Sequence, residues 1–147
     1  MKKSLLPILL ILFTLQQLPI KAAVAKVYQE SSYTEGNYTI IIEGYDWGPA
    51  VKKVVVSIKD VVTEANASDF SVAVKRTKEG VEMQPAESQG DREVLFAYVS
   101  DEEGNRIAEG NHISLVLLVH PNNPLDSPIK YIFKNGRGSN QWIDYSM

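Results

Sequence analysis

Residues 53–59 read Lys53-Val54-Val55-Val56-Ser57-Ile58-Lys59, and this stretch decides the expected fold. Val54, Val56 and Ile58 alternate with polar or charged neighbours at a spacing of two residues. Successive side chains of a β-strand point to opposite faces, so this spacing predicts a strand with one buried face. A helix would instead repeat its apolar positions every three to four residues.

The same period of two recurs along most of the chain from Tyr38 onward. It predicts further strands at residues 38–43, 69–75, 112–120 and 129–134, and a weaker one at residues 81–83. Residues 92–99 are apolar on both faces, which is typical of a central strand covered on two sides. The residues expected to face inward in these strands are Tyr38, Ile40 and Ile42; Phe70, Val72 and Val74; Ile113, Leu115, Leu117 and Val119; and Ile129, Tyr131 and Phe133.

Turn-forming segments rich in Gly, Pro, Asn and Asp separate the predicted strands. Examples are residues 48–49, 66–69, 101–105, 121–124 and 135–138. No segment has the pattern of an amphipathic helix. The sequence therefore predicts an all-β chain, an immunoglobulin-like antiparallel β-sandwich of about seven strands. A closed β-barrel with a similar number of strands remains an alternative, because alternation does not distinguish the two.

The first 25 residues have the layout of a secretory signal peptide. Met1-Lys2-Lys3 is positively charged, residues 5–18 are mostly Leu and Ile, and Ala23-Val24-Ala25 offers small residues for cleavage. The apolar run is too short for a spanning helix, which needs about 20 residues. We expect a signal peptide at residues 1–25, a polar leader at 26–36, and one domain at 37–147. The processed protein is then secreted or extracytoplasmic, with no membrane attachment.

Composition excludes several classes of function. The 147 residues include no cysteine and two histidines, so a disulfide framework, a thiol nucleophile and a three-histidine metal site are impossible. After removal of the predicted signal peptide the formal net charge falls to −6, with 12 Lys and Arg against 18 Asp and Glu. The short basic cluster at residues 75–78 is expected to be solvated, and nucleic acid is not an expected partner.

A search for catalytic residues finds none. The chain has no Gly-x-Ser-x-Gly motif, and the glycine-rich residues 136–140 are better explained as a flexible turn. His112 and His120 fall eight residues apart on one predicted strand. At about 3.3 Å per residue they would lie roughly 26 Å apart, too far to share one centre. The acidic residues 101–105 only faintly match a calcium loop, because glycine and glutamate are missing from its required later positions.

Aromatic residues are the remaining candidates for a binding function. Tyr45 and Trp47 follow the first predicted strand, and Trp142 and Tyr145 lie near the C-terminus. Exposed Tyr and Trp side chains stack on sugars or dock on another domain, because they combine apolar area with a polar tip. Core packing is the alternative interpretation of the same residues.

Several segments together resemble the immunoglobulin-like domain that precedes the catalytic domain in a family of secreted bacterial esterases. They are the residues 43–54 (EGYDWGPAVKKV), 68–72 (SDFSV), 98–105 (YVSDEEGN) and the ending 127–144, which closes with Asn140-Gln141-Trp142-Ile143-Asp144. The most specific parts are the Gly-Tyr-Asp-Trp-Gly-Pro-Ala segment and the Asn-x-Trp-x-Asp ending. The resemblance covers residues 38–144.

The resemblance implies a domain without catalytic residues that supports an α/β-hydrolase domain through domain or subunit association. It implies that Tyr45, Asp46, Trp47, Asn140, Trp142 and Asp144 are structural or interface positions, to which the aromatic Tyr145 is added as a candidate. No cofactor or metal is implied. The expected partners are a hydrolase domain or another copy of the chain. Because the sequence ends at Met147, where the family would continue into the hydrolase, we expect no enzymatic activity from this chain.

A second hypothesis assigns the chain to a different class. In this interpretation it is a carbohydrate- or surface-binding β-sandwich whose exposed aromatics, Tyr45, Trp47, Trp142 and Tyr145, contact the ligand. Whether these rings lie on the surface or in the core decides between the hypotheses, and alternation alone does not answer that question.

Overall fold

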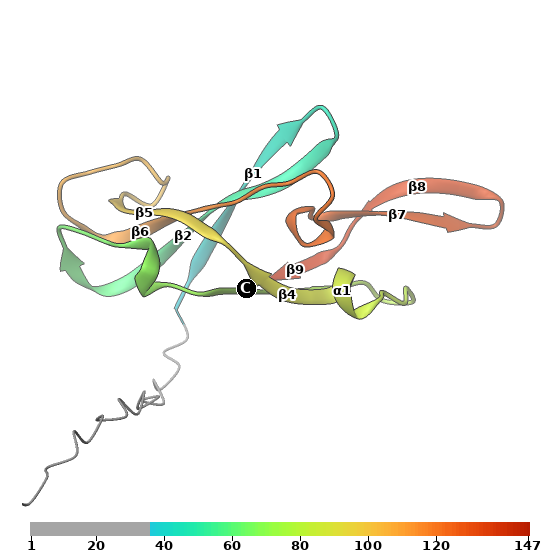
Figure 1. The fold of residues 1–147 in the computed structure, drawn as a ribbon, viewed down its shortest axis with the longest axis horizontal. Coiled ribbons are helices and arrows are strands. Elements are labelled where there is room, and N and C mark those ends of the chain that lie inside the picture. The colour runs from blue at the N-terminus through green and yellow to red at the C-terminus, as the bar shows by residue number, and fades with distance from the viewer. Residues whose placement is uncertain (1–35) are drawn as a thin grey trace, which may run out of the picture. The chain divides into compact units, whose positions relative to one another are not determined.

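The computed structural model describes residues 36–147, which form two facing β-sheets and a separate hairpin (Figure 1). The predicted signal peptide and all but the last residue of the predicted leader lie outside the described residues. The four-stranded sheet has the order β1-β2-β6-β5, with β1 at Tyr38–Tyr45, β2 at Gly48–Val62, β5 at Val94–Ser100 and β6 at Gly110–Leu117. The three-stranded sheet has the order β4-β3-β9, with β3 at Val72–Thr77, β4 at Gln89–Arg92 and β9 at Asp144–Ser146.

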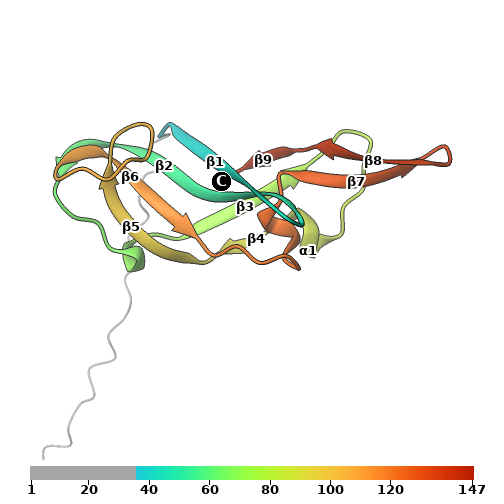
Figure 2. The same cartoon turned by 90° about the horizontal axis from the view of Figure 1, so that it is seen from above.

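The remaining strands, β7 (Ile129–Lys134) and β8 (Arg137–Trp142), pair only with each other. Three short helices connect the strands: η1 (Ala67–Asp69), α1 (Pro85–Ser88) and η2 (Pro124–Asp126). Every strand pairing is antiparallel. Seen from above, the β7–β8 hairpin continues past the end of the two larger sheets (Figure 2).

The core lies between the two larger sheets. Val51 and Val54 of β2 and Leu117 of β6 face Val72 and Val74 of β3, and all five are at most 7% exposed. Both sheets contribute alternate residues, as the period of two predicted. Because the strands form separate sheets and the core fills the space between them, the fold is an immunoglobulin-like β-sandwich and the barrel alternative is wrong.

Residues 92–99 are not one central strand. Arg92 ends β4 in the three-stranded sheet, and β5 begins at Val94 in the other sheet, so the chain changes sheets at Glu93. β5 lies at an edge, with β6 as its one neighbour, and Phe96 is 63% exposed. The apolar residues on both faces of β5 therefore do not indicate burial on two sides.

Two of the predicted inward faces are also wrong. Tyr131 and Phe133 of β7 are 64% and 70% exposed, because no other sheet covers the hairpin. In β1, Ile40 packs against the core, but Ile42, at the edge of the sheet, is 39% exposed. The register shift between Ile41 and Ile42 places the extra residue, Lys52, on β2, so that Val51 and Val54 of β2 both face the core.

Two smaller expectations also fail. Residues 81–83, the weaker predicted strand, form no strand. In the basic cluster at residues 75–78, Arg76 is 3% exposed and is therefore not solvated. It lies on the inward face of β3 because it alternates in register with Val72 and Val74.

Candidate functional site

The turn between β1 and β2 carries the first group of predicted site residues. Tyr45 ends β1, Asp46 and Trp47 form the turn, and Gly48 begins β2 with a φ of +125°. Glycine adopts this backbone conformation easily, whereas other residues do so at a cost. The Tyr45 and Trp47 rings stack with centroids 5.0 Å apart and planes 13° apart. The turn therefore presents a small aromatic surface, with Trp47 41% exposed and Asp46 exposed beside it.

The Tyr45 side chain is also held by its own strand. Its hydroxyl donates a hydrogen bond to Oε2 of Glu43 at 2.9 Å. Partial burial, followed by this bond to Glu43, raises the pKa of Tyr45 above its ordinary value. The bond to Glu43 thus helps to hold the ring in place against Trp47.

Asn140 and Trp142 lie on β8, in the hairpin. Antiparallel partners share a face, so the register places Trp142 beside Ile129, Asn140 beside Tyr131, and Gly138 beside Phe133 on one face, called here the aromatic face. Trp142 is 61% exposed. The Tyr131 ring lies across Gly138 so closely that a Cβ there would overlap it. The aromatic face is therefore a flat surface to which Asn140 contributes an amide.

Asp144 and Tyr145 lie in β9 and differ in their surroundings. Asp144 is exposed and pairs with Thr77 of β3. Tyr145 packs against the core, and its hydroxyl donates to the Leu125 carbonyl at 2.7 Å while accepting from Nη1 of Arg92 at 2.8 Å. Burial raises the pKa of Tyr145. Tyr145 therefore stabilises the fold and does not share a surface with the exposed rings.

The predicted site residues thus occupy three places. Tyr45, Asp46 and Trp47 share the β1–β2 turn, Asn140 and Trp142 share the hairpin, and the β9 pair lies in or beside the three-stranded sheet. The turn and the hairpin belong to different sheets. The four aromatics of the carbohydrate-binding hypothesis therefore do not form one platform.

A buried ion pair that the sequence did not predict links four parts of the chain: β4, β2, η2 and the segment after β6. Nε of Arg92 lies 2.8 Å from Oδ1 of Asp126, and both side chains are fully buried. Nη2 of Arg92 donates to the carbonyls of Val51 and Leu118 at 3.1 and 2.8 Å, and Nη1 donates to that of Leu125. One guanidinium thus connects β4 to β2, to η2 and to the segment after β6.

Asp126 has further partners of its own. It accepts hydrogen bonds from the His120 backbone N–H at 2.6 Å and from the Asn123 side-chain amide at 2.7 Å. Burial raises the pKa of Asp126, while the His120 N–H and Arg92 act in the opposite direction. His120 lies after the end of β6, so the prediction that His112 and His120 share one strand is wrong.

A second buried arginine anchors the hairpin. Nη1 of Arg76 donates to the Glu87 carbonyl at 2.6 Å and Nη2 donates to the Ile129 carbonyl at 3.1 Å, and burial lowers the pKa of Arg76. Nearby, Nζ of Lys130 pairs with Oε2 of Glu87 at 2.7 Å. These contacts hold the first residues of β7 to β3 and α1. The sequence signal for Arg76 is its place in the period of two that Val72 and Val74 begin, whereas Arg92 stands between Asp91 and Glu93 and has no such local signal.

The acidic turn at residues 101–105 is held together by the carboxylate of Asp101. Asp101 accepts from the backbone N–H groups of Glu103 and Asn105 and from the Asn105 side-chain amide, with donor–acceptor distances of 2.8–3.1 Å. These bonds, the Asn105 side chain first, lower the pKa of Asp101. Among residues 36–147 no three His, Asp or Glu side chains are grouped to hold a metal ion.

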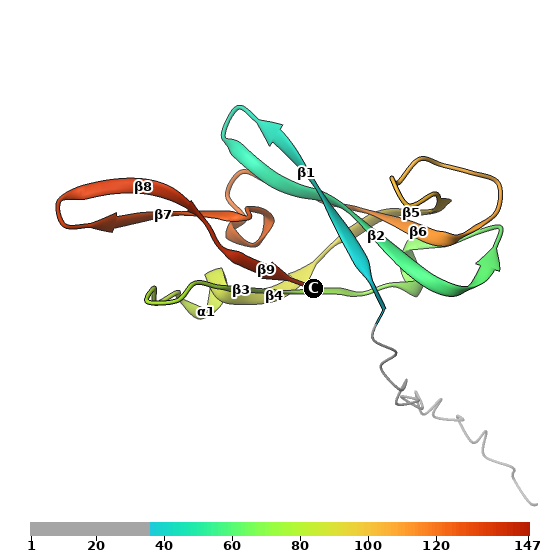
Figure 3. The ribbon, with the colours of Figure 1, turned by 180° about the vertical axis from the view of Figure 1, so that it is seen from behind.

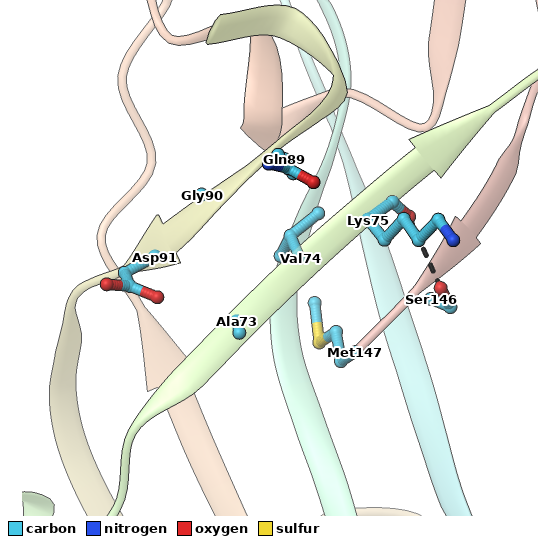
Figure 4. A pocket seen from close by; sticks show the side chains of 8 residues that line it. All are labelled: Ala73, Val74, Lys75, Gln89, Gly90, Asp91, Ser146 and Met147. Atoms are coloured by element: carbon cyan, nitrogen blue, oxygen red, sulfur yellow. Dashed lines mark hydrogen bonds between the residues drawn. The ribbon is translucent and has the colours of Figure 1, made fainter. Parts of the chain in front are cut away.

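A shallow hollow of about 440 Å³ lies on the three-stranded sheet (Figure 4). The small residues Ala73 and Gly90 open it, and Lys75, Asp91 and Ser146 line it, the Ser146 hydroxyl donating to the Lys75 carbonyl at 3.4 Å. No histidine lines the hollow, so Ser146 has no base beside it of the kind that activates a serine nucleophile. No helix in the described part of the chain is long and apolar enough to span a membrane.

Comparison with known proteins identifies the family of the chain and a solved structure with a similar fold. The family described as "Esterase Ig-like N-terminal domain" matches residues 37–147. A solved structure, "Crystal Structure of a Thermostable Esterase", aligns with a TM-score of 0.52 and 16% sequence identity over 76% of this chain. The aligned part is 28% of that esterase, and at this identity the likeness concerns the fold. No curated protein matches the sequence.

Proposed function

Because the chain belongs to the family of esterase Ig-like N-terminal domains, we propose that it is a secreted, non-catalytic accessory domain that supports the association of an esterase's hydrolase domain or subunits. The match over residues 37–147 is the observation that carries the proposal, since it includes every strand of the sandwich. This region of the family is the Ig-like part and not the catalytic part.

The β1–β2 turn is the surface we assign to this association. Tyr45 and Trp47 form a stacked pair with Asp46 beside them, and Gly48 fixes the path of the chain out of the turn. Tyr and Trp are enriched among the residues that contribute most to protein–protein binding, and charged residues such as Asp46 belong to the rim around them. The rigid strands on either side hold the pair in one position without a partner, which lowers the entropy lost on binding.

The first experiment tests the non-catalytic part of the proposal. The purified chain is incubated with a p-nitrophenyl ester of a short acid, with and without a serine-directed inhibitor. We expect no hydrolysis above the buffer rate. Turnover that the inhibitor abolishes would refute the proposal.

The second experiment tests association. The chain is mixed with an esterase of this family whose own Ig-like domain has been deleted, and complex formation is followed by sedimentation velocity together with esterase activity. We expect a complex with the chain, weakened about tenfold or more by Trp47→Ala, since interface tryptophans often contribute 2 kcal/mol or more. Phe96→Ala is the control, because Phe96 is exposed on β5, away from the turn. Absence of a complex, or equal loss with both variants, would contradict the assignment.

A further inference from the structure

The β7–β8 hairpin differs from the rest of the molecule in its exposure. It continues past the two larger sheets, and its strands pair only with each other (Figures 2 and 3). A two-stranded hairpin in water is at best marginally stable by itself. This one is held at its base by Arg76 and by the Lys130–Glu87 pair, and the residues of its distal half, 133–140, are exposed.

The hairpin also differs in charge. Between Ile129 and Trp142 the chain has Lys130, Lys134 and Arg137 and no Asp or Glu, whereas acidic residues outnumber basic ones in the chain as a whole. Lys130 is paired with Glu87, but Lys134 and Arg137 make no ion pair within residues 36–147. Glu79 and Glu82 line a hollow beside the hairpin together with Lys134. The strands of the hairpin are therefore cationic while its neighbouring loop is acidic, and the cations favour a negatively charged ligand.

A groove lies on the face of the hairpin opposite the aromatic face. Its volume is about 710 Å³, and it is lined by Lys134, Arg137, Ser139 and Gln141 around the apolar Ile132. The register agrees with this, since Lys134 is paired with Arg137 and Ile132 with Ser139. The groove thus combines two cations with a hydroxyl and an amide, the groups that bind carboxylate or sulfate and sugar hydroxyls.

The aromatic face supplies a second mode of contact. Tyr131 is 64% exposed and reaches over Gly138 with the hydroxyl end of its ring, and the neighbouring Phe133 and Trp142 are 70% and 61% exposed. Exposed aromatic rings stack on the apolar faces of sugars, whereas a small anion makes no such contact with them. A ligand that uses both faces must therefore be an extended polymer that crosses the hairpin.

We propose that the distal β7–β8 hairpin binds an acidic polysaccharide. Its carboxylate or sulfate groups pair with Lys134 and Arg137 in the groove, and sugar units further along the polymer, which passes over the edge of the hairpin, stack on Tyr131 and Phe133 on the opposite face. Nucleic acid fits less well, because only two free cations face it while the remainder of the domain is acidic. This binding is independent of any esterase partner and adds a function to the one proposed above.

The test is affinity electrophoresis of the full chain in gels that contain polygalacturonate, dextran sulfate or neutral dextran. We expect retardation in one or both acidic gels and none in dextran, and the two acidic gels separate carboxylate from sulfate recognition. The variant Lys134→Gln/Arg137→Gln should weaken binding about tenfold, because two exposed ion pairs are lost. Lys59→Gln/Lys75→Gln is the matched control, since both lysines are exposed and lie outside the hairpin.

A second pair of variants tests stacking. Phe133→Ser should weaken binding several-fold, while Phe96→Ser, at an equally exposed phenylalanine of β5, should not. Circular dichroism checks that each variant is folded. The proposal is overturned if no acidic gel retards the chain, if the hairpin variants bind as tightly as their controls, or if poly-glutamate or DNA binds as tightly as the polysaccharides.

Discussion

Replacing Asp126 by alanine is expected to destabilise the fold more than any surface substitution, because it leaves the buried Arg92 without its counter-charge. The two side chains are fully buried and 2.8 Å apart, so water cannot replace the missing carboxylate. The substitution also removes the acceptor for the His120 N–H and for the Asn123 amide. All of these groups lie where β4 meets η2.

The magnitude follows from burial. Removing one partner of a buried ion pair costs about 3–5 kcal/mol, because the remaining charge stays in a medium of low polarity. Domains of this size unfold with about 5–15 kcal/mol in total, so the variant would lose a large part of its stability. The carbonyls of Val51, Leu118 and Leu125 keep hydrogen bonds to Arg92, which favours the lower part of the range.

Urea unfolding is a suitable assay, because Trp47 and Trp142 provide fluorescence and circular dichroism gives an independent signal. For two-state unfolding, a lower midpoint at constant slope measures the change in the free energy of unfolding. The variant Glu87→Gln is the control. Its pair with Lys130 is partly exposed, with side chains 35% and 21% accessible, and such pairs contribute about 0–1 kcal/mol.

A loss below about 1 kcal/mol for Asp126→Ala would refute this reasoning, since it would mean that Arg92 does not need a buried counter-charge. The conservative variant Asp126→Asn separates charge from shape. It keeps the volume and one acceptor, but its NH2 group faces the donors on Arg92 and Asn123 or the His120 N–H. A loss that persists in it therefore combines the missing charge with one missing acceptor, whereas full recovery would mean that the charge of Asp126 is not needed.

Three further predictions concern Gly138, Glu87 and Leu117. Gly138→Ala should displace the Tyr131 ring, because the new Cβ would overlap it, and the tyrosine resonances in an NMR spectrum should shift while the core resonances do not. The Lys130 hydrogen bond, above all, lowers the pKa of Glu87 below its ordinary 4.5, so the pair contributes stability above pH 4.5 and loses it as the pH falls through the lower value of the folded state. The protection factors of the β7 amides, which are exchange rates corrected for the intrinsic effect of pH, should fall there, and equal protection factors at pH 3 and 6 would contradict this. Leu117→Ala, at a fully buried position, should cost about 2–5 kcal/mol in urea unfolding, and a loss below 1 kcal/mol would mean that the core closes around the cavity.

The alternation of apolar and polar residues identified most strand positions. It did not identify which apolar faces are covered by a second sheet. Val54, Val74 and Leu115 are buried as predicted, because each belongs to a strand with a sheet opposite its apolar face. Phe133 alternates with lysines in the same way and is 70% exposed. The pattern states that two faces of a strand differ, and it contains no information on what lies against either face.

The candidate site was predicted in part. The sequence predicted a turn at residues 48–49, and the structure turns at Asp46 and Trp47 directly before them. The stacking of Tyr45 on Trp47 was not predicted, and Tyr145 proved to be part of a buried hydrogen-bond network. The roles of these residues in association stay a prediction. Arg92 and Asp126 were overlooked because their partners are far apart in sequence, and charged residues are normally assigned to the surface.

The sequence by itself determined the class of the fold, because side-chain direction in a strand follows from covalent geometry and is written directly into the order of apolar and polar residues. Only the tertiary structure decided which apolar faces are covered. β3 and β7 have similar patterns, yet Val74 meets a second sheet and Phe133 meets none. Burial is a property of two surfaces together, so the exposed hairpin and the buried Arg92–Asp126 pair exist only once the strands are placed in space.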